Sequence, residues 1–300
     1  MSRFNTFRIS IEEYYRVHKR DLPWRKEVPV PYEVWLSEII LQQTRVAQGI
    51  PYFHKILQAF PSIESLALAD EDKLLALWTG LGYYNRARNL QKGARQILTD
   101  FNGQLPEQYD ALLKIKGIGP YTAAAIASIC FEEKIGVVDG NVYRVLSRYF
   151  GISTPTNSTS GQREFQTLAN ECIQGTKHPG LYNQGIMEFG ALHCTPKSPN
   201  CMYCPLNNSC HAFNSGEVSE LPVKLKKGKR TKETLHFGVV QNNKKVALRK
   251  RGTESIWAGL YEFPQLDGVP QNAQLLSEPL LHKLSHKDLY CSFWEVAEGD

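Results

Sequence analysis

Apolar residues recur at helical spacing through the first two thirds of the chain. In the segment 32–48, Trp35, Ile39 and Val46 fall on one stripe, which predicts an amphipathic helix over these residues. The segment 141–150 has the same period and predicts a second helix. Its apolar positions are Val142, Val145, Leu146 and Tyr149.

Three local features complete this helical region. Asn141 directly precedes an apolar helical stripe, so we expect it to cap the N-terminus of that helix. The segment 121–129 is rich in alanine and predicts a helix whose small face permits close packing. A short strand is expected only at 135–138, where the sequence reads IGVV.

The pattern changes after Cys210. Residues 221–232 hold six basic side chains and no acidic one, which is typical of a solvated linker. Short alternating runs then predict strands joined by turns, one of them at Asn242-Asn243. These runs cover 235–241, 244–251, 259–264 and 289–296.

We therefore expect a mainly α protein with three parts. A helical domain would span 1–212, a basic linker 213–233, and a small α+β domain 234–300. The last part is short for a self-sufficient core and has no closing helix, so its C-terminus is expected to be incomplete.

Composition narrows the class of protein. With 42% hydrophobic and 22% charged residues among 300, the chain is globular rather than disordered or coiled coil. It has no apolar run near the roughly 20 residues of a membrane span, and its first residues lack the apolar core of a secretory signal. A cytoplasmic location is expected, associated with the nucleoid if the protein binds DNA. The net charge of +5 is only mildly suggestive of nucleic acid.

Four cysteines lie close together in the sequence, in the order Cys194, Cys201, Cys204 and Cys210. Clustered thiols in a reducing compartment are typical metal ligands. Structural zinc sites more often use two CxxC pairs that lie far apart. Four thiols in one compact loop favour an iron–sulfur cluster over zinc, which remains the alternative.

Two carboxylates are candidates for acid-assisted chemistry. Glu38 has Val34 and Leu41 as helical neighbours, so burial would raise its pKa and let it serve as a general acid. Asp139 precedes a helix start, where the helix dipole would hold it ionised with a low pKa. Such a pair suits cleavage of a glycosidic bond. The alternatives are a solvent-exposed or Arg-paired Glu38 and an Asp139 that only caps its helix.

Two glycine-containing turns are candidates for nucleic-acid binding. Gly117 and Gly119 lie between an apolar helix and the Ala-rich one, which predicts a helix–hairpin–helix turn whose backbone N–H groups could hold a phosphate. The loop 78–88 combines glycines and tyrosines with Arg86 and Arg88, which could wedge into a duplex and hold phosphates. Each turn could equally be structural.

These motifs, in this order, resemble the helix–hairpin–helix DNA glycosylases that carry an iron–sulfur loop, and most closely the MutY-type adenine glycosylases. The resemblance covers 20–211 and continues weakly to the end of the chain. The matching elements are Leu22–Arg25, Trp35–Glu38, Leu41–Thr44, Gly80–Arg88, the hairpin that ends at Tyr121, Val138–Asn141, and the four-cysteine loop.

The resemblance implies a role for each matching residue. Glu38 would protonate the excised adenine, Asp139 would stabilise the oxocarbenium ion, and Tyr121 and Asn141 would orient them. Trp24, Arg25 and Gln184 would line the base pocket. The DNA-binding set would be Gln43, Thr44, Leu81, Tyr83, Arg86, Arg88, Gly117 and Gly119. The cysteines would hold one 4Fe-4S cluster. The substrate would be double-stranded DNA with adenine opposite 8-oxoguanine or guanine, and the protein would be a monomer without membrane contact.

Tyr121 distinguishes the MutY-type adenine glycosylases from the related endonuclease III-type enzymes. Endonuclease III-type glycosylases resemble the chain but carry a lysine at this hairpin position, whose amine can form the Schiff base needed for strand cleavage. A tyrosine cannot, so the resemblance implies a monofunctional glycosylase. A non-catalytic DNA-binding protein with a structural metal is the other alternative, and it predicts that Glu38 and Asp139 lie apart or face solvent.

The C-terminal part resembles the Nudix-like domain of the same family. It lacks the glutamate-rich box that holds Mg²⁺ in nucleotide hydrolases, so hydrolase activity is not expected. Leu284-Ser285-His286 matches the family's Phe-Ser-His loop, with Leu in place of Phe. The resemblance implies that Ser285 and His286 contact 8-oxoguanine.

Overall fold

The computed structural model describes residues 2–226, 230–242, 245–252, 257–269, 271, 273–284 and 287–296. The chain divides into two compact units, Met1–Leu225 and Lys226–Asp300. The division falls inside the segment 213–233 that the sequence marks as a linker.

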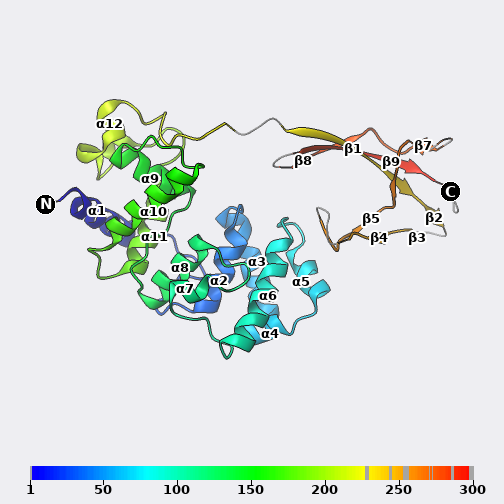
Figure 1. Cartoon of the computed structure of the whole chain (residues 1–300), viewed down its shortest axis with the longest axis horizontal. Helices are drawn as coiled ribbons and strands as arrows, with labels where there is room; N and C mark the ends of the chain where they lie inside the picture. Colours follow the sequence, from blue (N-terminus) through cyan, green and yellow to red (C-terminus); the bar gives the residue numbers. More distant parts are fainter. Residues whose placement is uncertain are drawn as a thin grey trace. The chain divides into compact units, whose positions relative to one another are not determined.

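The described part of the first unit is helical (Figure 1). Its helices are α1 (Arg3–His18), α2 (Pro31–Leu41), α3 (Val46–Ala59), α4 (Ile63–Ala67), α5 (Glu71–Trp78), α6 (Asn85–Asp100), α7 (Tyr109–Leu112), α8 (Pro120–Phe131), α9 (Gly140–Phe150), α10 (Thr159–Ile173), α11 (Pro179–Leu192) and α12 (His211–Ser215). Two 3-10 turns, η1 (Cys201–Tyr203) and η2 (Asn207–Ser209), lie in the cysteine loop. No helix among the described residues is long and apolar enough to cross a bilayer.

The helices form two lobes. Helices α2 to α6 pack on one another in one lobe, and α7 packs on α8. In the other lobe α1 packs with α9, α10 and α11. Helix α8 contacts α2 on one side and α11 on the other, so it joins the lobes (Figure 1). The two-lobed, mainly helical prediction is confirmed. The alanines of α8 are buried, and their small side chains permit this double contact.

Two predicted helices are confirmed and one is wrong in extent. The segments 121–129 and 141–150 lie within α8 and α9. The apolar positions of α9, namely Val142, Val145, Leu146 and Tyr149, are all buried. The segment 32–48 is not one helix, because α2 ends at Leu41 and α3 begins at Val46.

The break after α2 has a long-range cause. Gln43 adopts a left-handed conformation with φ 58°. Arg86, from α6, donates hydrogen bonds to the carbonyls of Ile39 and Ile40 at 3.0 and 2.9 Å. It therefore caps the C-terminal end of α2, which a positive charge stabilises. The strand expected at 135–138 is also wrong, because these residues pair with no strand in the part of the chain that the structure describes.

The described part of the second unit is a small sheet. Strands β1 (Thr231–Val239) and β9 (Lys287–Glu295) pair in parallel at its centre. The antiparallel neighbours are β6 (Gln265–Leu266) on β1, and β7 (Gln274–Leu275) and β8 (Leu280–Lys283) on β9. Short pairs join β2 (Gln241–Asn242) to β3 (Lys245–Val246), and β4 (Arg249–Lys250) to β5 (Tyr261–Glu262).

The runs 235–241 and 289–296 fall mainly in the long strands β1 and β9, whereas the described parts of 244–251 and 259–264 contain only two-residue strands. Asn243, in the predicted turn, lies outside the described residues. The core of this unit is small. The buried apolar residues are Leu235, Phe237, Leu289 and Cys291. Within the residues that the structure describes, the unit contains strands and turns but no helix, so the helical part of the α+β expectation is not found there.

Candidate active site

A cleft of about 990 Å³ brings together side chains from both lobes of the helical unit. Nine of the residues singled out from the sequence line it: Trp24, Arg25, Glu38, Gln43, Thr44, Tyr121, Asp139, Asn141 and Gln184. Leu81, Tyr83, Arg86, Arg88, Gly117 and Gly119 are not part of its lining. The two candidate carboxylates therefore face one space, although 100 residues of chain separate them.

Glu38 reaches the cleft from α2 and is only 9% exposed. Burial raises the pKa of its carboxyl to about 7, with a smaller upward contribution from the charge of Asp139. A hydrogen bond with Tyr121 opposes the shift. The predicted raised pKa is confirmed, and the expectation of a solvent-facing Glu38 is excluded. At neutral pH a large share of Glu38 carries a proton that it can donate.

Asp139 is the N-cap of α9, and Asn141 is the second residue of the helix, so the predicted capping role of Asn141 is wrong. The Oδ1 atom of Asp139 accepts hydrogen bonds from the backbone N–H groups of Asn141 and Val142 at 2.9 and 2.8 Å. Its Oδ2 atom accepts from Asn141 Nδ2 at 2.8 Å.

The expected low pKa of Asp139 is also wrong in direction. Burial raises the pKa of this carboxyl, and the hydrogen bonds from Val142 and Asn141 and the charge of Arg144 offset only part of the rise. The helix start supplies the hydrogen-bond donors that the sequence predicts, but the carboxyl also loses hydration where it lines the cleft. Desolvation therefore raises the pKa of Asp139 by more than the hydrogen bonds at the helix start lower it.

Tyr121 follows the hairpin turn as the second residue of α8. Its hydroxyl donates to Met187 Sδ at 3.1 Å. Burial, together with the charges of Glu38 and Asp139, raises the pKa of this phenol well above its ordinary value, so it stays protonated. The residue can act as a hydrogen-bond donor between the two carboxyls, but it offers no amine.

Glu188 is a residue of this cleft that the sequence analysis missed. It is 1% exposed and accepts hydrogen bonds from both Arg25 Nη atoms at 3.0 Å and from Arg20 Nε and Nη2 at 2.9 and 2.6 Å. Burial alone would raise the pKa of Glu188, but the hydrogen bonds from Arg20 and Arg25 lower it to about 2. As the lone acidic residue of the apolar helix α11, it carried a signal that could have revealed it.

Arg144 was missed as well. Its Nη2 atom donates to Asn141 Oδ1 at 3.0 Å and to the Gly190 carbonyl at 2.6 Å. Its Nε atom donates to the Cys194 carbonyl at 2.7 Å. Arg144 thus fixes the side chain that holds Asp139 and ties it to the start of the cysteine loop.

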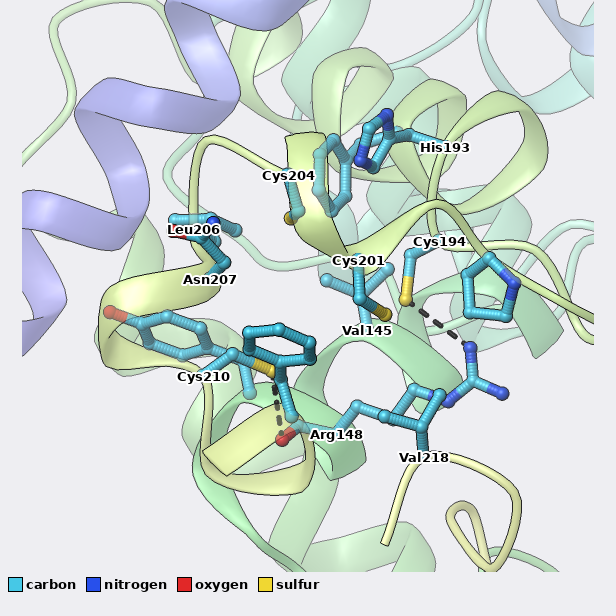
Figure 2. Close-up of a pocket in the computed structure, with 14 residues that line it drawn as sticks. Val145, Arg148, His193, Cys194, Cys201, Cys204, Leu206, Asn207, Cys210 and Val218 are labelled. Atoms are coloured by element: carbon cyan, nitrogen blue, oxygen red, sulfur yellow. Dashed lines mark hydrogen bonds between the residues drawn. The ribbon is translucent and has the colours of Figure 1, made fainter. Parts of the chain in front are cut away.

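The four cysteines of that loop line one cavity, and Figure 2 shows their side chains around it. Arg148 Nη1 approaches Cys194 Sγ at 3.5 Å, and Cys210 Sγ donates to the Arg148 carbonyl at the same distance. The remaining walls are mostly apolar, with Val145 and Leu206 among them. Among the described residues, no three His, Cys, Asp or Glu side chains converge closely enough to hold a single metal ion.

The helix–hairpin–helix turn is confirmed. Gly117 has φ +86°, and a Cβ atom there would lie 2.8 Å from Asn89 Cβ, so only glycine fits this position. A Cβ atom on Gly119 would meet open space. The backbone of the turn is therefore accessible at Gly119, next to the N-terminus of α8. Phosphate binding at this point stays a prediction.

The loop before α6 is more structural than the sequence suggests. Leu81 is buried in the core, whereas Tyr83 is 56% exposed with φ 48°. Besides the carbonyls of α2, Arg86 contacts those of Leu81 and Gly82 at 3.2 and 3.3 Å. Arg88 pairs with Glu71 at 3.0 Å. Both arginines therefore hold the loop itself. Ser285 and His286 lie outside the described residues.

This fold and cleft define the class of protein. The family described as HhH-GPD superfamily base excision DNA repair protein matches residues 36–170. A solved thermostable thymine-DNA glycosylase superimposes with a TM-score of 0.65 at 28% identity, covering 71% of this chain and 97% of its own. A trapped endonuclease III–DNA covalent intermediate shares the fold, with a TM-score of 0.60 at 22% identity and coverage of 72% and 99%.

Relatives with curated names define the family within this class. The adenine DNA glycosylase of Buchnera aphidicola from Schizaphis graminum is 38% identical over 93% of this chain and 84% of its own length. The human adenine DNA glycosylase is 41% identical over 72% of this chain. The chain belongs to the adenine DNA glycosylase family. It spans 41% of the human protein and 47% of the Arabidopsis thaliana relative.

Proposed function

We propose that the protein is a base-excision-repair DNA glycosylase that hydrolyses the N-glycosidic bond of adenine in double-stranded DNA. The observation that carries this proposal is one cleft that holds a buried carboxyl with a pKa of about 7, Glu38, together with the carboxyl of Asp139. The family membership supports the same activity.

The reaction follows from these two groups. The target adenine leaves the duplex stack and enters the cleft against Trp24, Arg25 and Gln184. Glu38 donates its proton to the adenine ring, so the bond between sugar carbon and ring nitrogen breaks with the electron pair on the base. The ionised carboxylate of Asp139 stabilises the cationic sugar. Water then adds to the sugar carbon and releases a proton, which leaves an abasic site and free adenine.

The glycosylase is proposed to be monofunctional. Among the described residues that line the cleft, none is a lysine, and Tyr121 stands where a lyase needs an amine. Strand cleavage through a Schiff base therefore lacks its nucleophile. If the purified protein cuts an abasic strand through a borohydride-trappable adduct, it is instead an endonuclease III-like lyase. The non-catalytic alternative is disfavoured because Glu38 and Asp139 share the cleft.

We propose that the opposite base is 8-oxoguanine or guanine. Gln43, Thr44 and the exposed Tyr83 would contact the duplex, and the hairpin of Gly117 and Gly119 would hold a phosphate. The second unit, proposed to be a Nudix-like domain following the linker 213–233, would read the lesion through Ser285 and His286. The protein would act as a monomer in the cytoplasm, on nucleoid DNA.

The cysteine cavity fits an iron–sulfur cluster. Cys194, Cys201, Cys204 and Cys210 surround one space between mostly apolar walls, and four thiols in one compact loop suit a cluster better than zinc. These four residues would hold a 4Fe-4S cluster. When bound, the cluster would order the loop 194–210 and take no part in bond cleavage. Arg144 and Arg148 hold that loop onto α9.

Base excision under single-turnover conditions tests this function. The purified chain is mixed with duplexes that carry adenine opposite 8-oxoguanine, guanine or thymine. We expect excision from the first two, and loss of excision but not of DNA binding in Glu38→Gln and Asp139→Asn. The matched controls are Glu33→Gln, a buried carboxylate on the same helix that is absent from the cleft lining, and Asp70→Asn, another helix cap. Full activity in either cleft variant contradicts the proposal.

A further inference from the structure

A second cavity of about 550 Å³ adjoins the base pocket. It shares with the cleft five residues, namely Arg20, Trp24, Arg25, Ile129 and Gln184. Three of them, Trp24, Arg25 and Gln184, are the proposed base-pocket residues. These three side chains therefore lie between two spaces, the catalytic cleft and the second cavity. The proposed excision reaction uses only the cleft.

Two side-chain hydrogen bonds hold Gln184 between these two spaces. Its Oε1 atom accepts from Tyr15 OH at 3.1 Å, and its Nε2 atom donates to the Gly180 carbonyl at 3.3 Å. Tyr15 and Gly180 both line the second cavity. Arg25 is held much more firmly by Glu188. Two long hydrogen bonds on a flexible side chain are easily exchanged for bonds to water or to a ligand.

The charges around the second cavity do not suit a nucleic-acid strand. Its lining has four basic and three acidic side chains. Glu188 pairs with Arg20 and Arg25, and Glu33 pairs with Lys26 at 2.6 Å. The remaining charges are those of Lys19, Asp21, Glu27 and Glu132. A nearly neutral cavity with acidic residues is a poor surface for phosphates but accepts an uncharged heterocycle.

The position of the second cavity bears on how the free base leaves the cleft after the glycosidic bond breaks. A flipped nucleotide enters the cleft from the duplex, and after bond cleavage the abasic strand still covers that entrance. The free base lies at the far end, against Trp24, Arg25 and Gln184. A cavity of a few hundred Å³ on the other side of these residues is large enough for a small heterocycle.

We propose that the second cavity is the exit for the free purine base, and that Gln184 opens the way while the abasic DNA remains bound. This inference rests on the proposed function. It makes base release and DNA release separate events, with the base leaving first through the side lined by Tyr15 and Leu181.

Filling the cavity from its outer side tests the proposal. Leu181 is partly exposed, lines the second cavity and is absent from the lining of the catalytic cleft. Leu181→Trp adds bulk to the exit, and Leu181→Ala is the matched control. A duplex with radiolabelled adenine opposite 8-oxoguanine is cleaved in a single turnover. One sample measures excision by alkaline cleavage of the abasic strand. Another is passed rapidly through a nitrocellulose filter that retains the protein–DNA complex, so free adenine is counted in the flow-through.

We expect wild type and Leu181→Ala to release adenine while the abasic DNA stays on the filter. Leu181→Trp should excise at the wild-type rate but release adenine at least about tenfold more slowly. Equal release rates in wild type and Leu181→Trp overturn the proposal, as does wild-type adenine that leaves only together with the DNA. The order in which the wild type releases adenine and DNA is measured without any variant. If circular dichroism shows that Leu181→Trp is misfolded, Leu181→Phe takes its place. Absence of excision in the wild type would instead refute the proposed function.

Discussion

Asn141 holds both oxygens of Asp139: its backbone N–H donates to Oδ1 at 2.9 Å and its side-chain amide to Oδ2 at 2.8 Å. The carboxylate therefore has a fixed orientation toward the cleft, and two of the bonds that favour its ionised form come from one residue. Residue 141 is a positioning residue for the group that stabilises the cationic sugar.

Asn141→Ala should leave the helix cap partly intact, because the backbone donors remain, but it removes the bond to Oδ2. We expect excision to fall by about one to two orders of magnitude, since the loss of one charge-assisted hydrogen bond costs roughly 1.5–3 kcal/mol. Single-turnover rates measure this, with Asn89→Ala as a control outside the cleft lining. An unchanged rate would mean that the orientation of Asp139 does not matter.

Glu38→Gln should abolish excision and yet stabilise the protein above neutral pH. The folded state raises the Glu38 pKa from 4.5 to about 7, so it binds the proton more tightly than the unfolded chain. Stability is then lost as the pH rises from about 4.5 through 7, by roughly 3 kcal/mol in total. The glutamine amide of the variant does not ionise, so it causes no such loss of stability. Thermal unfolding at about pH 8 and pH 5 tests this: the variant should gain stability over wild type only at the higher pH.

Glu188→Gln should lower the free energy of unfolding and raise the KM for the DNA substrate. The Glu188 pKa is lowered to about 2, so its contribution is present above about pH 4.5 and lost as the pH falls through 2. Because Arg20 is partly exposed, we expect a loss of roughly 2 kcal/mol at neutral pH. Arg25 also loses its anchor, so KM should rise. Urea unfolding and steady-state kinetics measure the two effects. Wild-type stability and a wild-type KM in the variant would show that Arg20 and Arg25 keep their positions without the Glu188 carboxylate.

Cys204→Ser should remove one cluster ligand and disturb the loop 194–210. We expect loss of the brown colour and visible absorption of the purified protein, lower stability and weaker DNA binding. Cys172→Ser, in a buried cysteine outside the loop, is the control that should keep the colour. A colourless wild type that contains zinc would contradict the cluster assignment.

The sequence predicted the parts of this site that depend on neighbours along the chain. The cysteine spacing, the turn at Gly117 and the apolar surroundings of Glu38 are all local patterns, and the structure bears out the turn and the burial. The resemblance to a known family then indicated which distant residues meet in the cleft.

What the sequence did not predict depends on long-range contacts. Glu188 pairs with arginines more than 160 residues away, and Arg144 binds the carbonyl of Cys194 50 residues away. The end of α2 is set by Arg86, from another helix. The pKa of Asp139 was expected in the wrong direction because burial is a property of the packed molecule, not of the helix start alone.

The dependence of single-turnover adenine excision on pH tests most directly whether protonated Glu38 is the general acid. With adenine opposite 8-oxoguanine, the wild-type rate should fall as the pH rises through about 7, the pKa of Glu38. The rate of Glu33→Gln should fall in the same way. A wild-type rate that stays constant from pH 6 to 9, with DNA binding intact, would contradict the account.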